Sequence, residues 1–420
     1  MAFQFIHAAD LHIDSPCRGL DRYEGAPVEE IRGATRRSLE NLVITGIEQS
    51  VDFVLLAGDI FDDDWKDFHT GLFFCEQMSQ LRRHEIPVFI VHGNHDSTGG
   101  MTKRLPLPDN VITFSSRTAE TYQLEDIQVA IHGRSFPERH VQEDFVPDYP
   151  EPVPDFFNIG MLHTSLDGRE GHADYAPTTF KNLQNKGYDY WALGHVHKRE
   201  VVNEYPRIVF PGNLQGRRAG EPGSKGFDLV TVTDEGEVHS EHVSADVVRW
   251  HQINLECAGI NSLEALKYKA VNALSQAMGF DSERLHAVRV TLTGQSPLDA
   301  EEAKTPGCLA ATVRASALEL DDAHLWIEKV RNQLHPTIDR PREAERDDAI
   351  GELIRLTNRI SSDPDSLRQF IQTQLDPALR VLPTELQNLE QLLEGEKLDQ
   401  IMLDAESTIY ATLTAIGGDA

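Results

Sequence analysis

Five apolar runs in the first half of the chain each lead into residues that can bind a metal ion. The runs are FQFIHA, VDFVLLA, PVFIV, FNIGML and YDYWAL. Such runs, alternating with polar or helical stretches, predict a layered α/β domain. Because α/β sheets place their sites at the carboxyl ends of the strands, we expect the side chains that follow these runs to meet at one edge. They are Asp10, His12, Asp59, Asn94, His95, Asp96, His163, His195 and His197.

The residue types in this set predict a site for two divalent cations. A lone histidine is more often a structural residue, but its recurrence at several strand ends indicates a shared site. Carboxylates, imidazoles and one neutral amide suit Mn²⁺ or Fe²⁺ and would accept Zn²⁺, whereas Ca²⁺ prefers oxygen ligands alone. These ligands are too many for one ion. Two ions bridged by a carboxylate fit better, and such a pair can hold a phosphoryl group.

The composition is typical of a soluble chain with more than one domain. Its 420 residues are enough for two or three domains. No apolar run reaches the roughly 18 to 20 residues of a membrane-spanning helix, and the amino terminus carries no basic, cleavable leader. We therefore expect a cytoplasmic protein with no membrane contact. The formal net charge of −29 argues against a simple basic nucleic-acid binder. A polyanionic substrate would need metal ions, a local basic patch or a partner.

Three segments with different patterns follow one another. Residues 1–245 carry the motifs at the strand ends. Residues 246–338 predict a small α+β module, with RWHQINLE and LHAVRVTLTG as strands and NSLEALKYKAVNALSQAM and DDAHLWIEKVRNQL as helices. Residues 339–420 are helical by pattern, and a helix of this kind either packs on its own chain or docks a partner. The apolar residues at helical spacing there are Leu386, Leu389, Leu393 and Ile401.

The motifs, taken in order, resemble the calcineurin-like metallophosphoesterase superfamily. They stand in residues 1–245 as DLH, GDIFD, GNHD, LHTS and GHVH. The stretches AADLHIDSP, AGDIFDDD, HGRSF and PGNLQGRRAGEPGSKGF resemble, more narrowly, the Mre11/SbcD-like nuclease branch, especially the YhaO-type DNA repair exonucleases of bacteria. The resemblance implies a layered metallophosphoesterase β-sandwich flanked by helices. It also implies that the α+β module is a capping domain, followed by a helical C-terminal segment.

The resemblance assigns a role to each residue at the strand ends. One metal ion would be held by Asp10, His12 and His197, the other by Asn94, His163 and His195, with Asp59 bridging the two. His95 would bind no metal and act as general acid, oriented by Asp96, while a metal-bridged hydroxide attacks phosphorus in line. Asp62 matches the second aspartate of GDIFD, although capping a helix N-terminus explains it equally well. Basic residues beside the motifs are candidates for binding phosphate, and they are Arg18, Arg134, Arg217, Arg218 and Lys225.

The function implied by the resemblance is a Mn²⁺-dependent phosphodiesterase that acts as an exonuclease on DNA ends in DNA repair. An SMC-like ATPase of the Rad50/SbcC type would be its partner, and relatives of this branch form homodimers through their phosphoesterase domains. Endonuclease cleavage stays open. A small-molecule phosphoesterase, such as a nucleotidase or a cyclic-nucleotide phosphodiesterase, would use the same two metals and explain the acidic composition more simply. A non-catalytic scaffold would be expected to have lost metal ligands, and all of them are present.

Overall fold

The chain forms two compact units in the computed structural model. The model describes residues 2–17, 20, 25–62, 68–97, 106–168, 175–279, 283–320 and 324–361, with positions 369, 373–374, 402, 405–410 and 412–414 beyond them. The first unit comprises residues 1–251, 281–287 and 323–326, and the second comprises residues 252–280, 288–322 and 327–420. Among the described helices, none is both long enough and apolar enough to cross a membrane.

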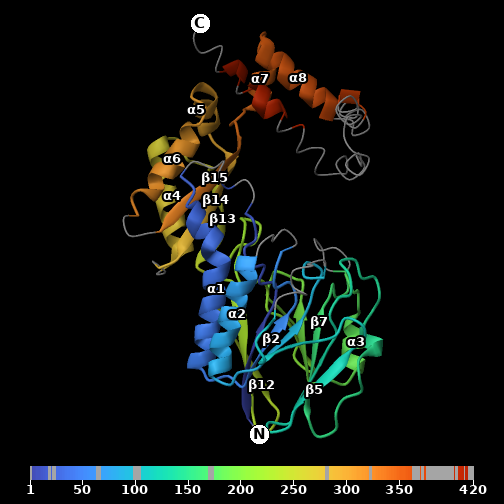
Figure 1. Cartoon of the computed structure of the whole chain (residues 1–420). Helices are drawn as coiled ribbons and strands as arrows, with labels where there is room; N and C mark the ends of the chain where they lie inside the picture. The colour runs from blue at the N-terminus through green and yellow to red at the C-terminus, as the bar shows by residue number, and fades with distance from the viewer. Residues whose placement is uncertain are drawn as a thin grey trace. The chain divides into compact units, whose positions relative to one another are not determined.

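The first unit contains two six-stranded sheets (Figure 1). The strands of one sheet are β1 (Phe3–Ala8), β2 (Phe53–Ala57), β3 (Val88–Val91), β4 (Val111–Thr113), β11 (Gly226–Val232) and β12 (Val238–Ser244). Those of the other are β5 (Glu120–Leu124), β6 (Val129–Gly133), β7 (Phe157–His163), β8 (Tyr190–Gly194), β9 (Glu200–Asn203) and β10 (Arg207–Phe210). Their orders are β12-β11-β1-β2-β3-β4 and β5-β6-β7-β8-β10-β9.

The strands that carry the motifs are parallel to one another. Strands β1 to β4 run parallel in the first sheet, as do β6, β7, β8 and β10 in the second. Strands β11, β12, β5 and β9 run antiparallel to their neighbours. The carboxyl ends of β1, β2 and β3 therefore lie at one edge of the first sheet, and those of β7 and β8 lie at one edge of the second.

The sheets pack face to face because neighbouring residues of each strand point to opposite sides. In β1, for example, Phe5 joins the core between the two sheets, whereas Ile6 joins the core beneath the helices. Helices α1 (Val28–Glu48) and α2 (Phe68–Arg83) cover the outer face of the first sheet (Figure 1). The short helices η3 (Val146–Asp148) and α3 (Phe180–Asn185) pack on the second. The predicted layered α/β sandwich is thereby confirmed.

The second unit combines most of a small sheet with helices. Strands β13 (Val248–Glu256), β14 (Leu285–Gln295) and β15 (Leu325–His335) form a three-stranded sheet in that order. Helix α4 (Leu263–Met278) begins at Ser262, whose side chain accepts a hydrogen bond from the backbone N–H of Ala265. It packs against α6 (Cys308–Ala317). The remaining helices are α5 (Leu298–Lys304), α7 (Arg340–Ala344) and α8 (Ala349–Ser361).

The prediction that DDAHLWIEKVRNQL forms a helix is wrong. Residues 325–335 form strand β15 instead, and the ion pair of Arg289 in β14 with Glu328 in β15 joins the two strands through contacts of 2.7 and 2.8 Å. The apolar residues of this stretch do recur at helical spacing, but pairing with β14 outweighs that local preference. The four apolar residues named for the C-terminal segment, Leu386, Leu389, Leu393 and Ile401, lie outside the described residues.

Strand β6 buries a histidine that makes the stability of the first unit depend on pH. The ring of His132 lies between Thr121 and Asn158, with Nδ1 2.8 Å from Oγ1 of Thr121 and Nε2 3.0 Å from Oδ1 of Asn158. It stacks on Tyr188, with the ring centroids 4.3 Å apart. Burial lowers the pKa of His132 from 6.5 to about 4, so its ring is neutral in the folded protein at pH 7.

We expect acid to destabilise the first unit through His132. Below pH 6.5 the unfolded chain takes up a proton that the folded protein excludes, so this contribution to stability is complete above pH 6.5 and is lost as the pH falls towards 4. Between about pH 7.5 and 5 the loss is about 2 kcal/mol. Urea unfolding of the wild type and of His132→Gln at both pH values measures it. The variant should lose less stability on acidification, and equal losses would contradict the assignment.

Candidate metal centre

The loops after β1 and β2 run side by side and carry the first three predicted ligands. The backbone N–H of Asp10 donates to the carbonyl of Gly58 at 3.0 Å, and that of His12 donates to the carbonyl of Asp59, also at 3.0 Å. Asp10, His12 and Asp59 have positive φ values of 52°, 45° and 52°. Few residues other than glycine adopt this conformation, and it is concentrated at functional sites. It turns the three side chains into one cluster beyond the strand ends.

Two glycines let the sheets approach each other at this edge. A Cβ atom on Gly194, the last residue of β8, would lie 1.9 Å from the carbonyl oxygen of Ala57 at the end of β2. A Cβ on Gly58, whose φ is +94°, would lie 2.4 Å from Nδ1 of His163. Neither contact leaves room for a side chain. The glycines that precede Asp59 and His195 therefore allow ligands from both sheets to meet.

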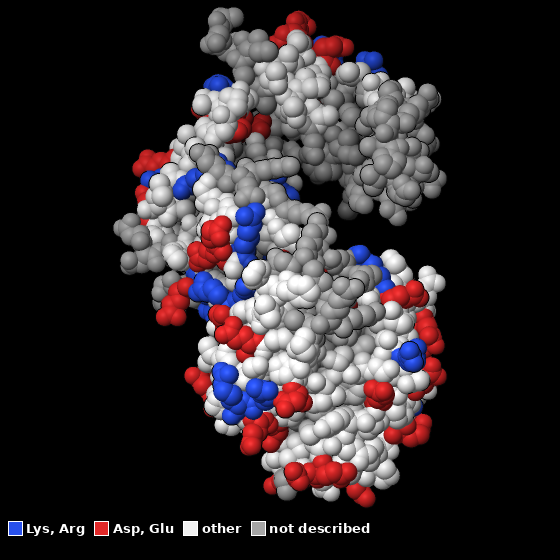
Figure 2. Space-filling model, in the orientation of Figure 1, with Lys and Arg blue, Asp and Glu red and all other residues white. Residues whose placement is uncertain are grey.

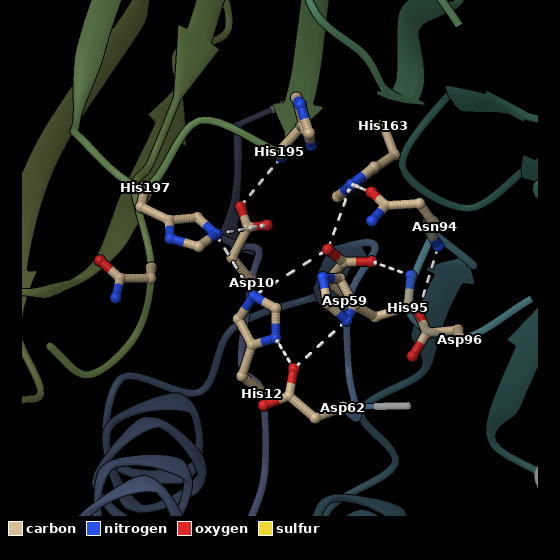
Figure 3. Close-up of polar contacts among 12 residues, drawn as sticks. Asp10, His12, Asp59, Asp62, Asn94, His95, Asp96, His163, His195 and His197 are labelled. Carbon is tan, nitrogen blue, oxygen red and sulfur yellow. Dashed lines mark hydrogen bonds and ion pairs between the residues drawn. The ribbon is translucent and has the colours of Figure 1, made fainter. Parts of the chain in front are cut away.

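One group of ligands consists of Asp10, His12 and His197 (Figure 3). Nε2 of His197 lies 3.6 Å from Oδ1 of Asp10 and 3.3 Å from Nε2 of His12. One atom from each of the three residues falls within 4.8 Å of the others, which is the spacing that one shared cation needs. The three residues predicted to hold one metal ion are therefore brought together.

A second group lies around Asp59 and His163. Nε2 of His163 is 3.4 Å from Oδ2 of Asp59 and 3.1 Å from Oδ1 of Asn94. The same oxygen of Asp59 lies 3.9 Å from Nε2 of His12, so Asp59 stands between the two groups, where a bridging carboxylate is expected. The ring of His195 packs edge-on against that of His163, with the centroids 5.2 Å apart. All seven predicted ligands thus lie in one cluster.

The donor atoms of this cluster fit divalent cations. Asp10 is 1% exposed, and its Oδ2 accepts a hydrogen bond from the backbone N–H of His195 at 3.0 Å. Within the described residues its Oδ1 accepts no hydrogen bond, and the ring of His197 lies 3.6 Å away. A buried carboxylate oxygen that accepts no hydrogen bond is costly. A cation between Asp10 and His197 would satisfy it, and the mixture of carboxylate, imidazole and amide donors suits such an ion.

Three histidines, His12, His163 and His197, each use one ring nitrogen to fix their orientation and turn the other towards the centre. Nδ1 of His12 lies 2.6 Å from Oδ1 of Asp62, and Nδ1 of His197 lies 3.1 Å from Oε1 of Glu221. Nδ1 of His163 donates to the carbonyl of Ala57 at 3.0 Å. Metal-binding histidines are typically held in this way. Asp62 therefore orients a ligand. Glu221, which the sequence analysis missed, has the same role.

The pKa is lowered for His12 but raised for His163 and His197. Burial, reinforced by the positive charge of Arg217, lowers the pKa of His12. Burial also opposes a charge on His163, but Asp59 outweighs it and raises the pKa of His163 to about 9. For His197, burial is likewise outweighed by Asp10 and Glu221, which raise its pKa to about 9. At pH 7, His163 and His197 each hold a proton that a metal ion would displace.

His95 lies beside the centre and pairs with a different carboxylate from the one predicted. Its Nδ1 is 3.4 Å from Oδ1 of Asp62, and its backbone N–H donates to Oδ1 of Asp59 at 3.0 Å. Asp96 instead accepts backbone N–H groups of Ile60, Phe61 and Gly93 at 3.2, 2.9 and 3.1 Å. The prediction that Asp96 orients His95 is therefore corrected, because Asp96 ties the loop after β3 to the loop after β2.

The basic residues predicted to bind phosphate lie in different places. Arg217 is next to the centre, with Nη1 3.5 Å from Oδ2 of Asp62. Lys225 is buried, and its Nζ donates to the carbonyl of His197 at 2.6 Å. Arg134 is buried with its guanidinium 3.8 Å from the ring centroid of Phe145. Neither Lys225 nor Arg134 presents its charge to solvent, and Arg18 lies outside the described residues.

Comparison with known proteins identifies the fold and the family. Residues 3–199 match the model of calcineurin-like phosphoesterases, and residues 250–335 match that of the middle domain of metallophosphoesterase YhaO. The chain is 37% identical over 297 residues to the uncharacterized metallophosphoesterase YhaO of Bacillus subtilis, covering 70% of this chain and 72% of that protein. It is 25% identical over 272 residues to the DNA double-strand break repair protein Mre11 of Methanopyrus kandleri, covering 57% of this chain and 56% of that protein.

A dimetal phosphatase from Danio rerio aligns in structure with a TM-score of 0.36 and 12% identity, over 57% of this chain and 98% of that one. The match to the phosphoesterase model and the similarity to YhaO show a phosphoester hydrolase, and the cluster of carboxylates and imidazoles at the strand ends is its candidate metal site. The chain belongs to the calcineurin-like metallophosphoesterases. Within them, its first unit and its middle segment together resemble YhaO, and its similarity to Mre11 proteins is more distant.

Asp59→Asn should abolish metal binding at the centre. The amide keeps the shape of the side chain but removes the charge that stands between the two ligand groups. Elemental analysis after dialysis should find about two ions for each wild-type chain and fewer than one for the variant. Asp189→Asn is the matched control, because Asp189 directly precedes β8 at the opposite end of that strand, where it accepts the backbone N–H of Asn158. Equal metal content in wild type and Asp59→Asn would rule out a role for Asp59 as bridge.

Proposed function

We propose that the protein is a two-metal phosphodiesterase, a Mn²⁺-dependent DNA exonuclease of the Mre11/SbcD type that acts in DNA repair in the cytoplasm. The observation that carries this proposal is the position of Asp59. One of its oxygens lies between His163 and His12, which belong to the two ligand groups, while the other is fixed by the backbone of His95. A carboxylate in that position can bridge two ions, and a bridged pair suits phosphodiester hydrolysis.

The chain's own residues prepare the site for hydrolysis. A bound pair of Mn²⁺ ions supplies an activated water and neutralises charge on the phosphoryl oxygens. His95 is suited to hold the proton for the departing oxygen, because its side chain is 29% exposed, more open than those of His12 and His163. The contact of its Nδ1 with Asp62 holds the ring beside the centre, and a positioned imidazole is the usual general acid near neutral pH.

DNA is proposed as substrate from the resemblance to Mre11 proteins. The relative from Methanopyrus kandleri is named as a DNA double-strand break repair protein. The charge of the molecule gives less support. On the face of the first unit seen in Figure 2, the described Lys and Arg side chains form small groups between Asp and Glu. With a net charge of −29, affinity for a polyanion would depend on the metal ions and on a partner.

The resemblance to this branch also supports two assemblies. One is a complex with an SMC-like ATPase of the Rad50/SbcC type, which would provide a DNA-binding surface that an acidic chain does not. The other is a homodimer through the phosphoesterase domains. A small-molecule phosphoesterase is the second candidate function, because the burial of Lys225 and Arg134 removes two of the phosphate contacts expected for a long polyanion.

We expect the purified chain with Mn²⁺ to release nucleotides from the ends of linear duplex DNA. The measurement uses end-labelled duplex beside bis-p-nitrophenyl phosphate, with Asp59→Asn as the inactive control. Product that accumulates from the ends, and disappears in the control, is the expected result. Cleavage of the small diester with DNA untouched, even after addition of an SMC-like ATPase, would favour the small-molecule function and reject the nuclease.

His95→Gln should separate proton transfer from metal binding. The glutamine can still form hydrogen bonds but cannot donate a proton as an imidazolium does, so turnover of a substrate with a poor leaving group should fall by about 10²-fold or more. Metal content should stay at the wild-type level. Turnover of bis-p-nitrophenyl phosphate, whose leaving group needs little protonation, should fall much less. A variant that lost one of its metal ions would show that His95 is a ligand and not the acid.

A further inference from the structure

Five side chains form a closed ring beside the ligand group of Asp10. Nε2 of His12 faces Nε2 of His197 across 3.3 Å. Behind them, Nδ1 of His12 meets Asp62 at 2.6 Å, and Nδ1 of His197 meets Glu221 at 3.1 Å. Arg217 closes the ring, because its Nη1 lies 3.5 Å from Oδ2 of Asp62 and its Nη2 lies 3.2 Å from Oε1 of Glu221.

Glu221 is the most heavily bonded member of this ring. It is 5% exposed. Besides the ring of His197, its carboxylate accepts the side chain of Asn213 at 2.9 Å and the backbone N–H of Arg217 at 2.9 Å. Glu221 is thus a carboxylate in a fixed position, and it fixes Arg217 in turn.

We propose that Arg217 is a positioning residue for one metal ion, the one held by Asp10, His12 and His197, and not a contact for substrate phosphate. This inference rests on the proposed two-metal centre. The side chain of Arg217 is 16% exposed, and both ends of its guanidinium are engaged by carboxylates of the protein. Those two carboxylates orient the two histidines of a single metal position. The guanidinium of Arg217 therefore sets the distance between the two carboxylates, and through them the distance between the two histidines.

The geometry explains why an arginine stands here. The guanidinium is rigid and planar and can engage two carboxylates at once, whereas a lysine ammonium is a single point of charge. Without the cation, Asp62 and Glu221 would face each other as buried, unbalanced anions, and they would move apart together with the histidines they hold. His163 and Asn94 take no part in the ring, since His163 is oriented by the carbonyl of Ala57. The second position should therefore keep its ion.

The test is the Mn²⁺ stoichiometry of Arg217→Gln, measured by calorimetric titration of the chelator-treated full chain. The wild type should bind two ions. The variant should bind one ion with unchanged affinity and the other about 10- to 100-fold more weakly, the usual effect of losing an outer contact to a metal ligand. Electron paramagnetic resonance gives an independent readout, because a coupled Mn²⁺ pair and a single Mn²⁺ ion have different spectra. Arg217→Lys should recover part of the lost affinity and not all of it.

Arg218→Gln is the matched control. Arg218 is the next residue and its Nε lies 3.7 Å from Oε1 of the same Glu221, but its side chain is 78% exposed. Its contribution should be screened by solvent, so both ions should bind as in the wild type. If Arg217→Gln does not fold, Arg217→Lys makes the test alone, because a lysine cannot engage Asp62 and Glu221 at once.

Three results would overturn the inference. One is wild-type affinity for both ions in Arg217→Gln, combined with a raised KM for DNA and a weaker dependence of binding on salt, which would make Arg217 a substrate contact. Another is equal weakening of both ions in Arg217→Gln or in Arg217→Lys. The third is an equal effect of Arg218→Gln. A wild type that binds no Mn²⁺ would instead reject the proposed two-metal function itself.

Discussion

The hydrogen bond from Nδ1 of His163 to the carbonyl of Ala57, 3.0 Å long, is the contact on which the centre depends. It joins the last residue of β7 in one sheet to the last residue of β2 in the other. It also fixes the ring so that Nε2 turns to Asp59 and Asn94. A Cβ on Gly194 would clash with the same carbonyl group. The distance between the two sheets therefore depends on the absence of a side chain at Gly194. The distance between ligands from opposite sheets depends on it too.

Neighbouring histidines reduce the repulsion between the buried carboxylates of the centre before any metal binds. Asp10 and Asp59 are both 1% exposed, and two buried carboxylates so close together would repel one another. His197 and His163 lie beside them, and each has a pKa of about 9. At neutral pH these imidazolium rings offset the two anions. A divalent cation would exchange its charge for those protons, so folding leaves a preformed site.

Residues at the strand ends could be predicted from the sequence because an apolar run followed by His, Asp or Asn marks them directly. Glu221 carries no such signal: it lies 24 residues beyond His197, in a loop, and only the three-dimensional course of the chain brings the two side chains to 3.1 Å. Asp96 was misassigned for the opposite reason. Adjacency to His95 suggested a pair, but the carboxylate of Asp96 accepts backbone N–H groups of Ile60 and Phe61 in the neighbouring loop and of Gly93 in its own turn.

The sequence also could not show which basic residues are available to bind a substrate. A sequence shows that a positively charged residue lies near a motif. It does not show whether that residue contacts carbonyl or carboxylate groups of the protein itself. Lys225 and Arg217 are both committed to groups of the protein, one to the carbonyl of His197 and the other to two carboxylates. Lys225 therefore holds the loop that carries His197, and Arg217 lies between the two carboxylates that contact His12 and His197. If the proposed nuclease function holds, the positive charge that meets the scissile phosphate comes from the metal ions and not from Lys225.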